Sequence, residues 1–293
     1  MKKIVVSLIS LLLVACSSNT NSSTETNIQP STKSRTNASS ESMDIPNWTW
    51  DFSTQRALVY SFSQKMEIEN TAGKDRPMNE MITEGLGKIK IQVKENNEAD
   101  IRFEDMVMKV IQLDETGVAR DTIENPIPPS VLSGYSNQGT FDEPNANAYF
   151  SYILPLPSRD LAINERDSII LNQSFGTKDF MLKAEGVNAL VFERMETIDN
   201  RYCAVLKGII DIDIQDTPQD ASGEYIFSTK GEGTYYFDVE NRIYYGSDIS
   251  LIKETKMVTG DTPEKKGIFM HNKSKEVYSI RLLDIEENTE SEE

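Results

Sequence analysis

The sequence has few of the residues that most enzymes and metal sites use. It contains two cysteines, Cys16 and Cys203, and one histidine, His271, among 293 residues. A Ser-His-Asp or Cys-His catalyst would have to use His271, and a zinc enzyme normally needs more His and Cys ligands than the chain offers. We therefore expect no metal site, no cofactor and no enzymatic activity.

Basic residues are also scarce. The chain has 30 Lys and Arg against 47 Asp and Glu, so its formal net charge is −17. A nucleic-acid binder needs clustered Lys and Arg to contact phosphates, and this acidity excludes a nucleic-acid partner. Apolar residues make up 38% of the chain, which is enough to build a core.

Long apolar runs are absent except at the N-terminus. Lys2 and Lys3 precede an apolar stretch over residues 4–14, which only two serines interrupt, and Ala15 and Cys16 follow it. These are the three regions of a secretory signal, and the apolar stretch is too short to span a bilayer stably. We predict that residues 1–15 are a signal peptide.

The end of this segment, Leu13-Val14-Ala15-Cys16, resembles the lipobox of bacterial lipoproteins. In that family Cys16 would carry a diacylglycerol on its sulfur, and signal peptidase II would cut between Ala15 and Cys16. The resemblance implies a lipid-anchored protein of the cell envelope whose first partner is the membrane, since two or three acyl chains hold a protein there durably. In enterobacterial-type lipoproteins, a residue other than Asp directly after the lipidated cysteine implies delivery to the outer membrane. Ser17 occupies that position here, so it indicates the outer membrane. The alternative is an ordinary secretory signal that ends in Ala-Cys.

A polar segment follows the predicted lipidation site. Ser, Thr and Asn account for 18 of the 26 residues in 17–42, and such a stretch cannot offset its ordering entropy by burial. We predict a disordered tether over 16–45 and a β domain over 46–283. Residues 284–293 carry six carboxylates and no base, so we expect an acidic tail that frays into solvent.

Alternating apolar and polar residues predict half-buried β-strands in the domain. One strand is indicated at 58–68, where only Gln64 interrupts the apolar positions, and others at 89–93, 99–103, 190–198, 202–206 and 210–214. Asn96-Asn97 and Asp199-Asn200 are predicted tight turns. Further strands are expected at 224–229, 234–239, 242–252 and 275–283.

The predicted fold class is all-β, with a curved antiparallel sheet or half-barrel of about ten to twelve strands. A sheet of this size usually curls, because a flat one leaves exposed edges. No long amphipathic helix is predicted; residues 78–85 and 130–134 are expected to make a helical turn or two at most. Two similar halves are a further hypothesis, because Gly139–Asp142 is similar to Gly233–Asp238 and the extended run 154–157 can join the halves.

The lipobox, the tether, Leu154-Pro155-Leu156-Pro157 and the motif from Gly231 to Asp238 together resemble uncharacterised envelope lipoproteins with a domain of unknown function. More distantly, the architecture is similar to the half-barrels that carry lipoproteins and lipids across the periplasm. No family active-site residue can be transferred from either resemblance.

Four aromatic residues, Trp48, Trp50, Tyr235 and Tyr244, are candidate ligand contacts. Exposed rings of this kind can stack on a glycan or an acyl chain, whereas buried rings form the core and its cross-strand pairs. Burial is the outcome that we expect for them.

The remaining candidate residues have simple structural explanations. Cys203 alternates with Val205 on a predicted strand, which indicates a buried thiol. His271 lies in a lysine-rich stretch that is typical of a surface loop. Asp211 and Asp213 share a strand face, and calcium favours such oxygen ligands, but the loop pattern of a calcium site is missing and we interpret them as solvent-facing.

Taken together, these residues predict a lipid-anchored, non-catalytic envelope protein. Its concave sheet face is expected to bind an apolar ligand or an envelope protein. Two alternatives stay open at this point, namely a structural scaffold of the envelope and a hydrolase that uses carboxylates alone.

Overall fold

The structure is a computed structural model, and it describes residues 45–54, 56–73, 79–114, 116–177, 180–216, 223–260 and 269–287. The predicted signal peptide, Ala15, Cys16, almost all of the tether and the last six residues lie outside these ranges. The cleavage and lipidation sites therefore stay predictions. All described residues except Ile45 belong to the compact unit that begins at Pro46.

Eleven strands account for most of this unit. They are β1 (Arg56–Ala72), β2 (Asn79–Val93), β3 (Glu98–Leu113), β4 (Ala119–Pro126), β5 (Ser130–Ser136), β6 (Arg166–Thr177), β7 (Phe180–Ile198), β8 (Arg201–Asp216), β9 (Gly223–Asp238), β10 (Ile243–Thr259) and β11 (Phe269–Glu287). All belong to one antiparallel sheet with the order β4-β3-β2-β1-β11-β10-β9-β8-β7-β6, and β5 pairs with β3. The first and last strands are therefore neighbours inside the sheet.

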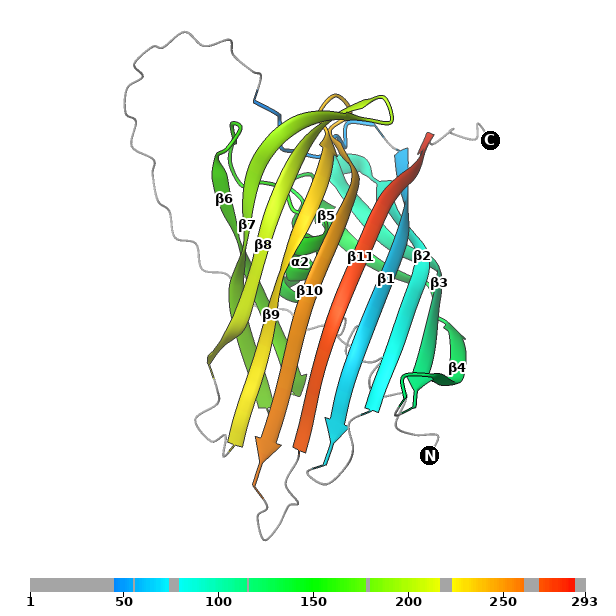
Figure 1. Ribbon diagram of the computed structural model, residues 1–293. Coiled ribbons are helices and arrows are strands. Elements are labelled where there is room, and N and C mark those ends of the chain that lie inside the picture. The colour runs from blue at the N-terminus through cyan, green and yellow to red at the C-terminus, as the bar shows by residue number, and fades with distance from the viewer. Residues whose placement is uncertain are drawn as a thin grey trace. The chain divides into compact units, whose positions relative to one another are not determined.

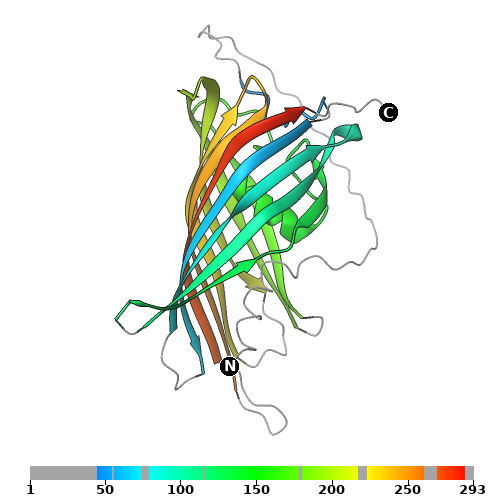
Figure 2. The same ribbon diagram turned by 90° about the vertical axis from the view of Figure 1, so that its right-hand side faces the viewer.

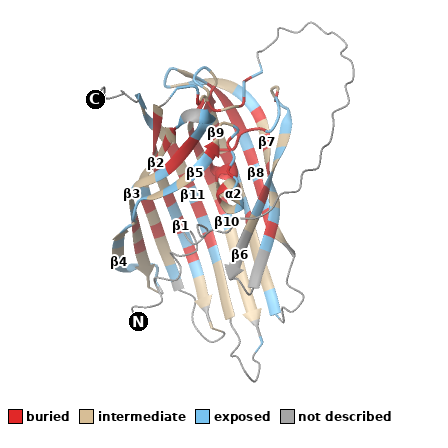
Figure 3. Cartoon of the chain, turned by 180° about the vertical axis from the view of Figure 1, so that it is seen from behind, coloured by how far each residue is buried: buried red, intermediate tan, exposed pale blue. Residues whose placement is uncertain are grey.

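The sheet is curved and open (Figures 1 and 2). Among the described strands, β4 and β6 end the order and no pairing joins them. The curvature gives the sheet a convex face, seen in Figure 1, and a concave face, seen from behind in Figure 3. The predicted fold class, an all-β curved sheet of about ten to twelve strands, is confirmed.

The two predicted turns are also found. Asn96 and Asn97 have φ values of 72° and 60°, and Asp199 and Asn200 have 47° and 65°. Both pairs connect consecutive antiparallel strands, β2 to β3 and β7 to β8. Asn and Asp tolerate this left-handed backbone better than other residues that carry a side chain.

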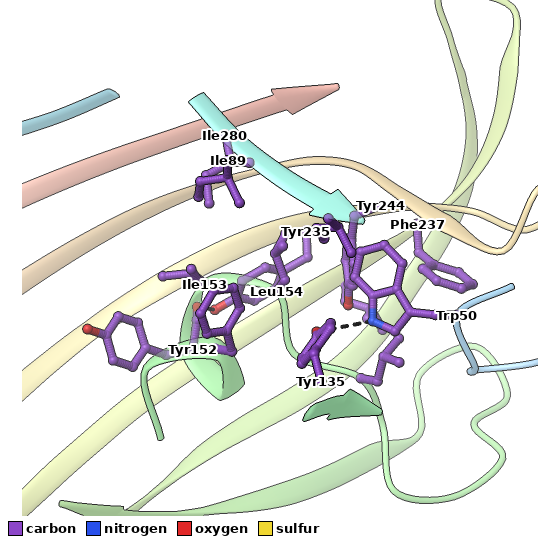
Figure 4. Packing of buried hydrophobic residues seen from close by; sticks show 14 of the residues in the cluster. Trp50, Ile89, Tyr135, Tyr152, Ile153, Leu154, Tyr235, Phe237, Tyr244 and Ile280 are labelled. Atoms are coloured by element: carbon purple, nitrogen blue, oxygen red, sulfur yellow. Dashed lines mark hydrogen bonds between the residues drawn. The ribbon is translucent and has the colours of Figure 1, made fainter. Parts of the chain in front are cut away.

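The core lies on the concave face. Leu58, Tyr60 and Phe62 of β1 point to it, and their neighbours across β2 and β11 include Ile89 and Ile280. Figure 4 shows that aromatic rings from several strands meet here. Alternation along each strand therefore directs one set of residues inward and the other set to the convex face.

One helix, α2 (Pro144–Ile153), lies on the concave side of the sheet. It begins at Pro144, and the Glu143 carboxylate caps it by accepting from the backbone N–H groups of Asn145 and Ala146. The sequence analysis predicted no helix here, because ten residues with Asn, Ser, Tyr and Ile have weak helix propensity. A Pro at the first position and Pro155 just beyond the end are the signals that could have found it.

Several predicted details are wrong. Residues 79–85 belong to β2 and 130–134 to β5, so neither forms a helical turn. The strands expected at 224–229 and 234–239 are one continuous β9, and β11 extends to Glu287, so the first four residues of the predicted acidic tail pair with β1.

The predicted internal duplication finds no structural counterpart in its two motifs. Gly139 lies in a turn with φ of 76°, whereas Gly233 lies inside β9. The run Leu154-Pro155-Leu156-Pro157 does join the two parts of the sheet, since it leads from α2 toward β6. All four of its residues are buried.

Candidate functional site

The C-terminal end of α2 is fixed to the concave face by side chains of the sheet. The last carbonyl groups of a helix lack partners within the helix and need partners elsewhere when they are buried. Here three of them accept hydrogen bonds from side chains of β7, β9 and β10. The bonds are Asn188 Nδ2 to Ser151 O (3.0 Å), Tyr235 Oη to Tyr152 O (2.8 Å) and Ser247 Oγ to Ile153 O (2.8 Å). Just beyond the helix, Tyr244 Oη donates to Pro155 O.

Glycines leave the space that these side chains occupy. A Cβ atom added at Gly233 would lie 2.9 Å from Cε2 of Tyr235 and closer still to its hydroxyl oxygen. A Cβ at Gly208, which pairs with Gly233 across the strands, would also lie 2.9 Å from the same ring atom. The Tyr235 ring can therefore lie flat along the sheet and reach α2 only because both neighbours are glycines.

A polar cluster lies on the concave face next to this core. It consists of Gln64, Lys253, Ser274, Glu276 and Tyr278, which come from β1, β10 and β11. The Glu276 carboxylate accepts hydrogen bonds from Ser274 Oγ at 3.0 Å and from the Tyr278 hydroxyl, and Lys253 Nζ lies 2.8 Å from its Oε2 atom. Gln64 Nε2 donates to the Tyr278 hydroxyl at 2.9 Å.

The charges in the polar cluster balance each other. Burial acts to raise the pKa of Glu276, but the Lys253 ammonium and the three hydrogen bonds outweigh it, so the pKa lies below its ordinary value. Burial, together with the Glu276 charge, raises the pKa of Tyr278. The cluster is therefore a neutral arrangement of one carboxylate and one ammonium with a protonated phenol beside them.

Beyond the polar cluster, the strand register places a group of half-buried apolar side chains on the concave face, with the polar Thr255 and Asn272 among them. We call this region the lower concave face; it lies below α2 in Figure 1 and is formed by Ile214, Tyr225, Phe227, Met257 and Met270. All five side chains are half-buried. Figure 3 shows the same contrast, because buried residues surround α2 and the strand ends below it are mostly of intermediate exposure.

The four aromatic candidates lie in the core. Trp48, Trp50, Tyr235 and Tyr244 are 4%, 1%, 0% and 0% exposed. Trp50 Nε1 donates to the Tyr135 hydroxyl at 3.1 Å (Figure 4), and the Trp48 ring packs edge-on against Phe192. Burial, the outcome expected from the sequence, is what the structure shows. A role in ligand contact stays a prediction that would need the core to open.

Cys203 and His271 lie on strands of the sheet, β8 and β11. Cys203 is completely buried, as predicted, and burial raises the pKa of its thiol to about 12. His271 lies on β11 and not in a loop, and its Nε2 atom is 2.7 Å from Glu254 Oε1. The loop prediction failed because the lysine-rich stretch forms the outward face of a long strand.

Asp211 and Asp213, the acidic candidates, lie near a lysine side chain. Lys230 Nζ lies 3.3 Å from both Asp211 and Asp213, and supplies their counter-charge. Within the described ranges, no group of three or more His, Cys, Asp and Glu side chains is placed to hold a metal ion. The described carboxyl groups whose pKa departs clearly from its ordinary value all shift downward, whereas a general acid needs a raised pKa.

The convex face has a pocket of about 380 Å³, which is lined by Arg194, Glu196, Ile198, Asp199, Tyr236, Tyr245 and Arg281. Several of its polar groups are paired with one another or with adjacent residues. Arg281 lies 5.6 Å from the Tyr236 ring centre and donates to Asp248, while the Tyr245 hydroxyl donates to Asp199.

Sequence reasoning missed the polar cluster. Gln64 was visible as the one polar residue at an inward position of its strand, and that interruption was the available signal. Lys253 and Glu276 lie on different strands, and only the strand register shows that they meet.

Comparison with known proteins gives only remote matches among solved structures. No family model and no curated protein matches the chain. A structure of lipovitellin, described by its lipid–protein interactions, aligns over 83% of this chain at 10% identity and a TM-score of 0.43, and the chain spans 26% of that protein's length.

Two bacterial structures align over most of both chains. A DUF1329 family protein from Desulfovibrio piger covers 82% of this chain and 88% of its own at 9% identity, with a TM-score of 0.17. A domain from Vibrio parahaemolyticus, described as an outer membrane lipoprotein-sorting protein, covers 80% and 87% at 10% identity, with a TM-score of 0.15. At these TM-scores we argue neither fold nor function from the likeness.

Among the residues that the structure describes, no helix is long and apolar enough to cross a bilayer.

Proposed function

We propose that the protein binds an acyl-chain ligand on its lower concave face. The observation that carries the proposal is the set of five half-buried apolar side chains, Ile214, Tyr225, Phe227, Met257 and Met270, on the face that elsewhere holds the core. A ligand that covers them removes apolar surface from water, which stabilises the complex by about 25 cal/mol per Å².

The surroundings suit a binding site for an apolar molecule. Such sites are concave, mostly apolar and largely formed in advance, and they contain a few placed polar groups. Here α2 is held to the sheet by hydrogen bonds from Asn188, Tyr235, Tyr244 and Ser247, so it forms a fixed wall at one end of the region. The polar cluster lies between that wall and the apolar surface.

A matched pair of variants on β10 tests the proposal. Met257 faces the lower concave face, and Ile252 of the same strand is 64% exposed on the convex face. Met257→Glu places a charge on the proposed contact surface and is expected to weaken binding of a fluorescent apolar probe, N-phenyl-1-naphthylamine, at least tenfold. Ile252→Glu adds the same charge and is expected to leave the affinity unchanged. An equal effect of the two variants would contradict the proposal, and so would a wild-type protein that does not bind the probe saturably.

We also propose that Cys16 anchors the domain to an envelope membrane. Support comes from the lipobox-like run that ends at Cys16 and from the polar tether after it. Metabolic labelling with an alkyne fatty acid should mark the full chain, and Cys16→Ser should abolish the label and release the protein from membranes. Cys203→Ser serves as the control and should keep the label, because that thiol is buried.

A further inference from the structure

Thr229 is a buried polar residue without a partner, and it lies beside the polar cluster. It is 1% exposed, and its Oγ1 atom has no hydrogen-bond partner among the residues that the structure describes. An unpaired buried hydroxyl costs free energy, since the group has lost its water and gained nothing. A position of this kind needs an explanation, and a ligand group that completes the hydrogen bond is one.

The strand register places Thr229 directly opposite Lys253. The two residues are partners across β9 and β10, and Lys253 is in turn the partner of Ser274 on β11. Directly opposed side chains on one face of an antiparallel pair have Cβ atoms about 4.5–5.5 Å apart. The Thr229 hydroxyl and the Lys253 ammonium can therefore bind the same ligand atom or two adjacent ones.

Lys253 has donor capacity to spare. An ammonium group carries three N–H donors, and within the described ranges the Lys253 Nζ atom has one acceptor, Oε2 of Glu276 at 2.8 Å. Its side chain is 25% exposed, whereas the Glu276 side chain is only 7% exposed and already accepts from Ser274 and Tyr278. The accessible group of the polar cluster is therefore the Lys253 ammonium, which is a donor.

The charge balance decides between a charged and an uncharged ligand group. Glu276 neutralises Lys253 within the protein, so an anionic head group would bring an uncompensated negative charge into a mostly buried site. An uncharged carbonyl oxygen accepts from the same two donors without that cost. Apolar residues lie next to Thr229 on the same face of the sheet. Phe227 is two positions away on β9, and Ile212 is the partner of Thr229 on β8.

From this geometry we infer that Lys253 and Thr229 form a recognition site for the carbonyl oxygen of an acyl ester whose hydrocarbon chain lies on the lower concave face. This inference rests on the proposed function and adds the chemical class of the ligand to it. The protein is then selective for esterified acyl chains over free fatty acids and over plain hydrocarbons.

The test measures how three ligands of equal chain length displace N-phenyl-1-naphthylamine from the purified protein at pH 7.5. The ligands are methyl laurate, laurate and dodecane. The wild-type protein is expected to bind methyl laurate at least fivefold more tightly than dodecane and also more tightly than laurate. Binding of laurate as tight as that of methyl laurate, or tighter, would overturn the inference.

Thr229→Val is the decisive variant, because it removes the hydroxyl and keeps the shape of the side chain. It is expected to lower the affinity for methyl laurate about fivefold, the equivalent of one hydrogen bond, and to change the affinity for dodecane less than twofold. The variant should melt no lower than the wild type, since the lost hydroxyl had no partner. Thr234→Val on the convex face of the same strand, where the hydroxyl accepts from Lys207, is the control and should change neither affinity.

Two negative results have different meanings. If the probe binds the wild type but Thr229→Val leaves the ratio of ester to hydrocarbon affinity unchanged, the ester site is wrong and the acyl-binding proposal stands. If the probe does not bind the wild type at all, the acyl-binding proposal itself is wrong and the ester site fails with it.

Discussion

Replacing Gly233 with alanine is expected to detach α2 from the sheet and to destabilise the domain. The added Cβ would lie 2.9 Å from Cε2 of Tyr235, a distance that real Cβ contacts do not show. The Tyr235 ring is completely buried and cannot swing away without losing the hydrogen bond from its hydroxyl to Tyr152 O. Inserting a methyl group into a packed core costs about 1–3 kcal/mol, and leaving a buried carbonyl unpaired costs a further ~1–3 kcal/mol.

The expected loss in the free energy of unfolding is therefore about 2–6 kcal/mol for Gly233→Ala. Urea denaturation followed by tryptophan fluorescence measures it, because Trp48 and Trp50 lie in the same core. Gly85→Ala is the matched control. Gly85 also lies on the concave side of a central strand, but the nearest atom to its added Cβ is Gln64 Cβ at 3.7 Å, an ordinary contact.

Because alanine restricts the unfolded chain more than glycine, Gly85→Ala should be neutral or stabilising by up to ~1 kcal/mol. If Gly233→Ala and Gly85→Ala shifted the urea midpoint equally, the close packing of Tyr235 on α2 would be refuted. The same result would remove the reason for regarding α2 as a fixed wall of the proposed binding surface.

Three more predictions follow from the same contacts. Tyr235→Phe keeps the ring and removes the hydroxyl that bonds Tyr152 O, so the domain should lose about 1–3 kcal/mol, as measured by urea denaturation. Because the pKa of Glu276 lies below its ordinary value of 4.5, its ionised form stabilises the fold fully above about pH 4.5, and this contribution is lost as the pH falls through the lowered value. The stability difference between the wild type and Glu276→Gln should therefore shrink on acidification from pH 6 to pH 3, and a constant difference would contradict the pairing with Lys253. Cys203, whose pKa is raised to about 12, should resist iodoacetamide in the native protein and react only after unfolding; fast native labelling would show that the thiol is accessible.

The sequence allowed the strands to be predicted because their periodicity is local. The alternation over 58–68 indicated the inward face of β1. Residue types that tolerate positive φ, such as Asn96 and Asn200, marked the hairpins, and both residues adopt positive φ in the structure. The α2 helix was missed for a physical reason as well. Its own residues favour a helix weakly, and it is stabilised by the cap at Glu143 and by donors on distant strands, which no local pattern shows.

The candidate site depends on contacts between residues far apart in the sequence. Gln64 and Tyr278 are 214 positions apart and meet because the first and last strands pair. Lys253 and Glu276 are ordinary surface residues by composition, and the register alone puts them on the concave face. Such an arrangement could be recognised from the sequence only after the order of the strands was known.

The most direct measurement of the central claim is photo-crosslinking of the protein with an uncharged acyl ester that carries a diazirine on its chain. Mass spectrometry of the digested adduct then locates the labelled residues. Labels are expected on Ile214, Phe227, Met257 and Met270 of the lower concave face, and excess methyl laurate should compete them away. Labels on convex residues such as Ile170 or Ile209, or labelling that no competitor reduces, would contradict acyl binding by the concave face.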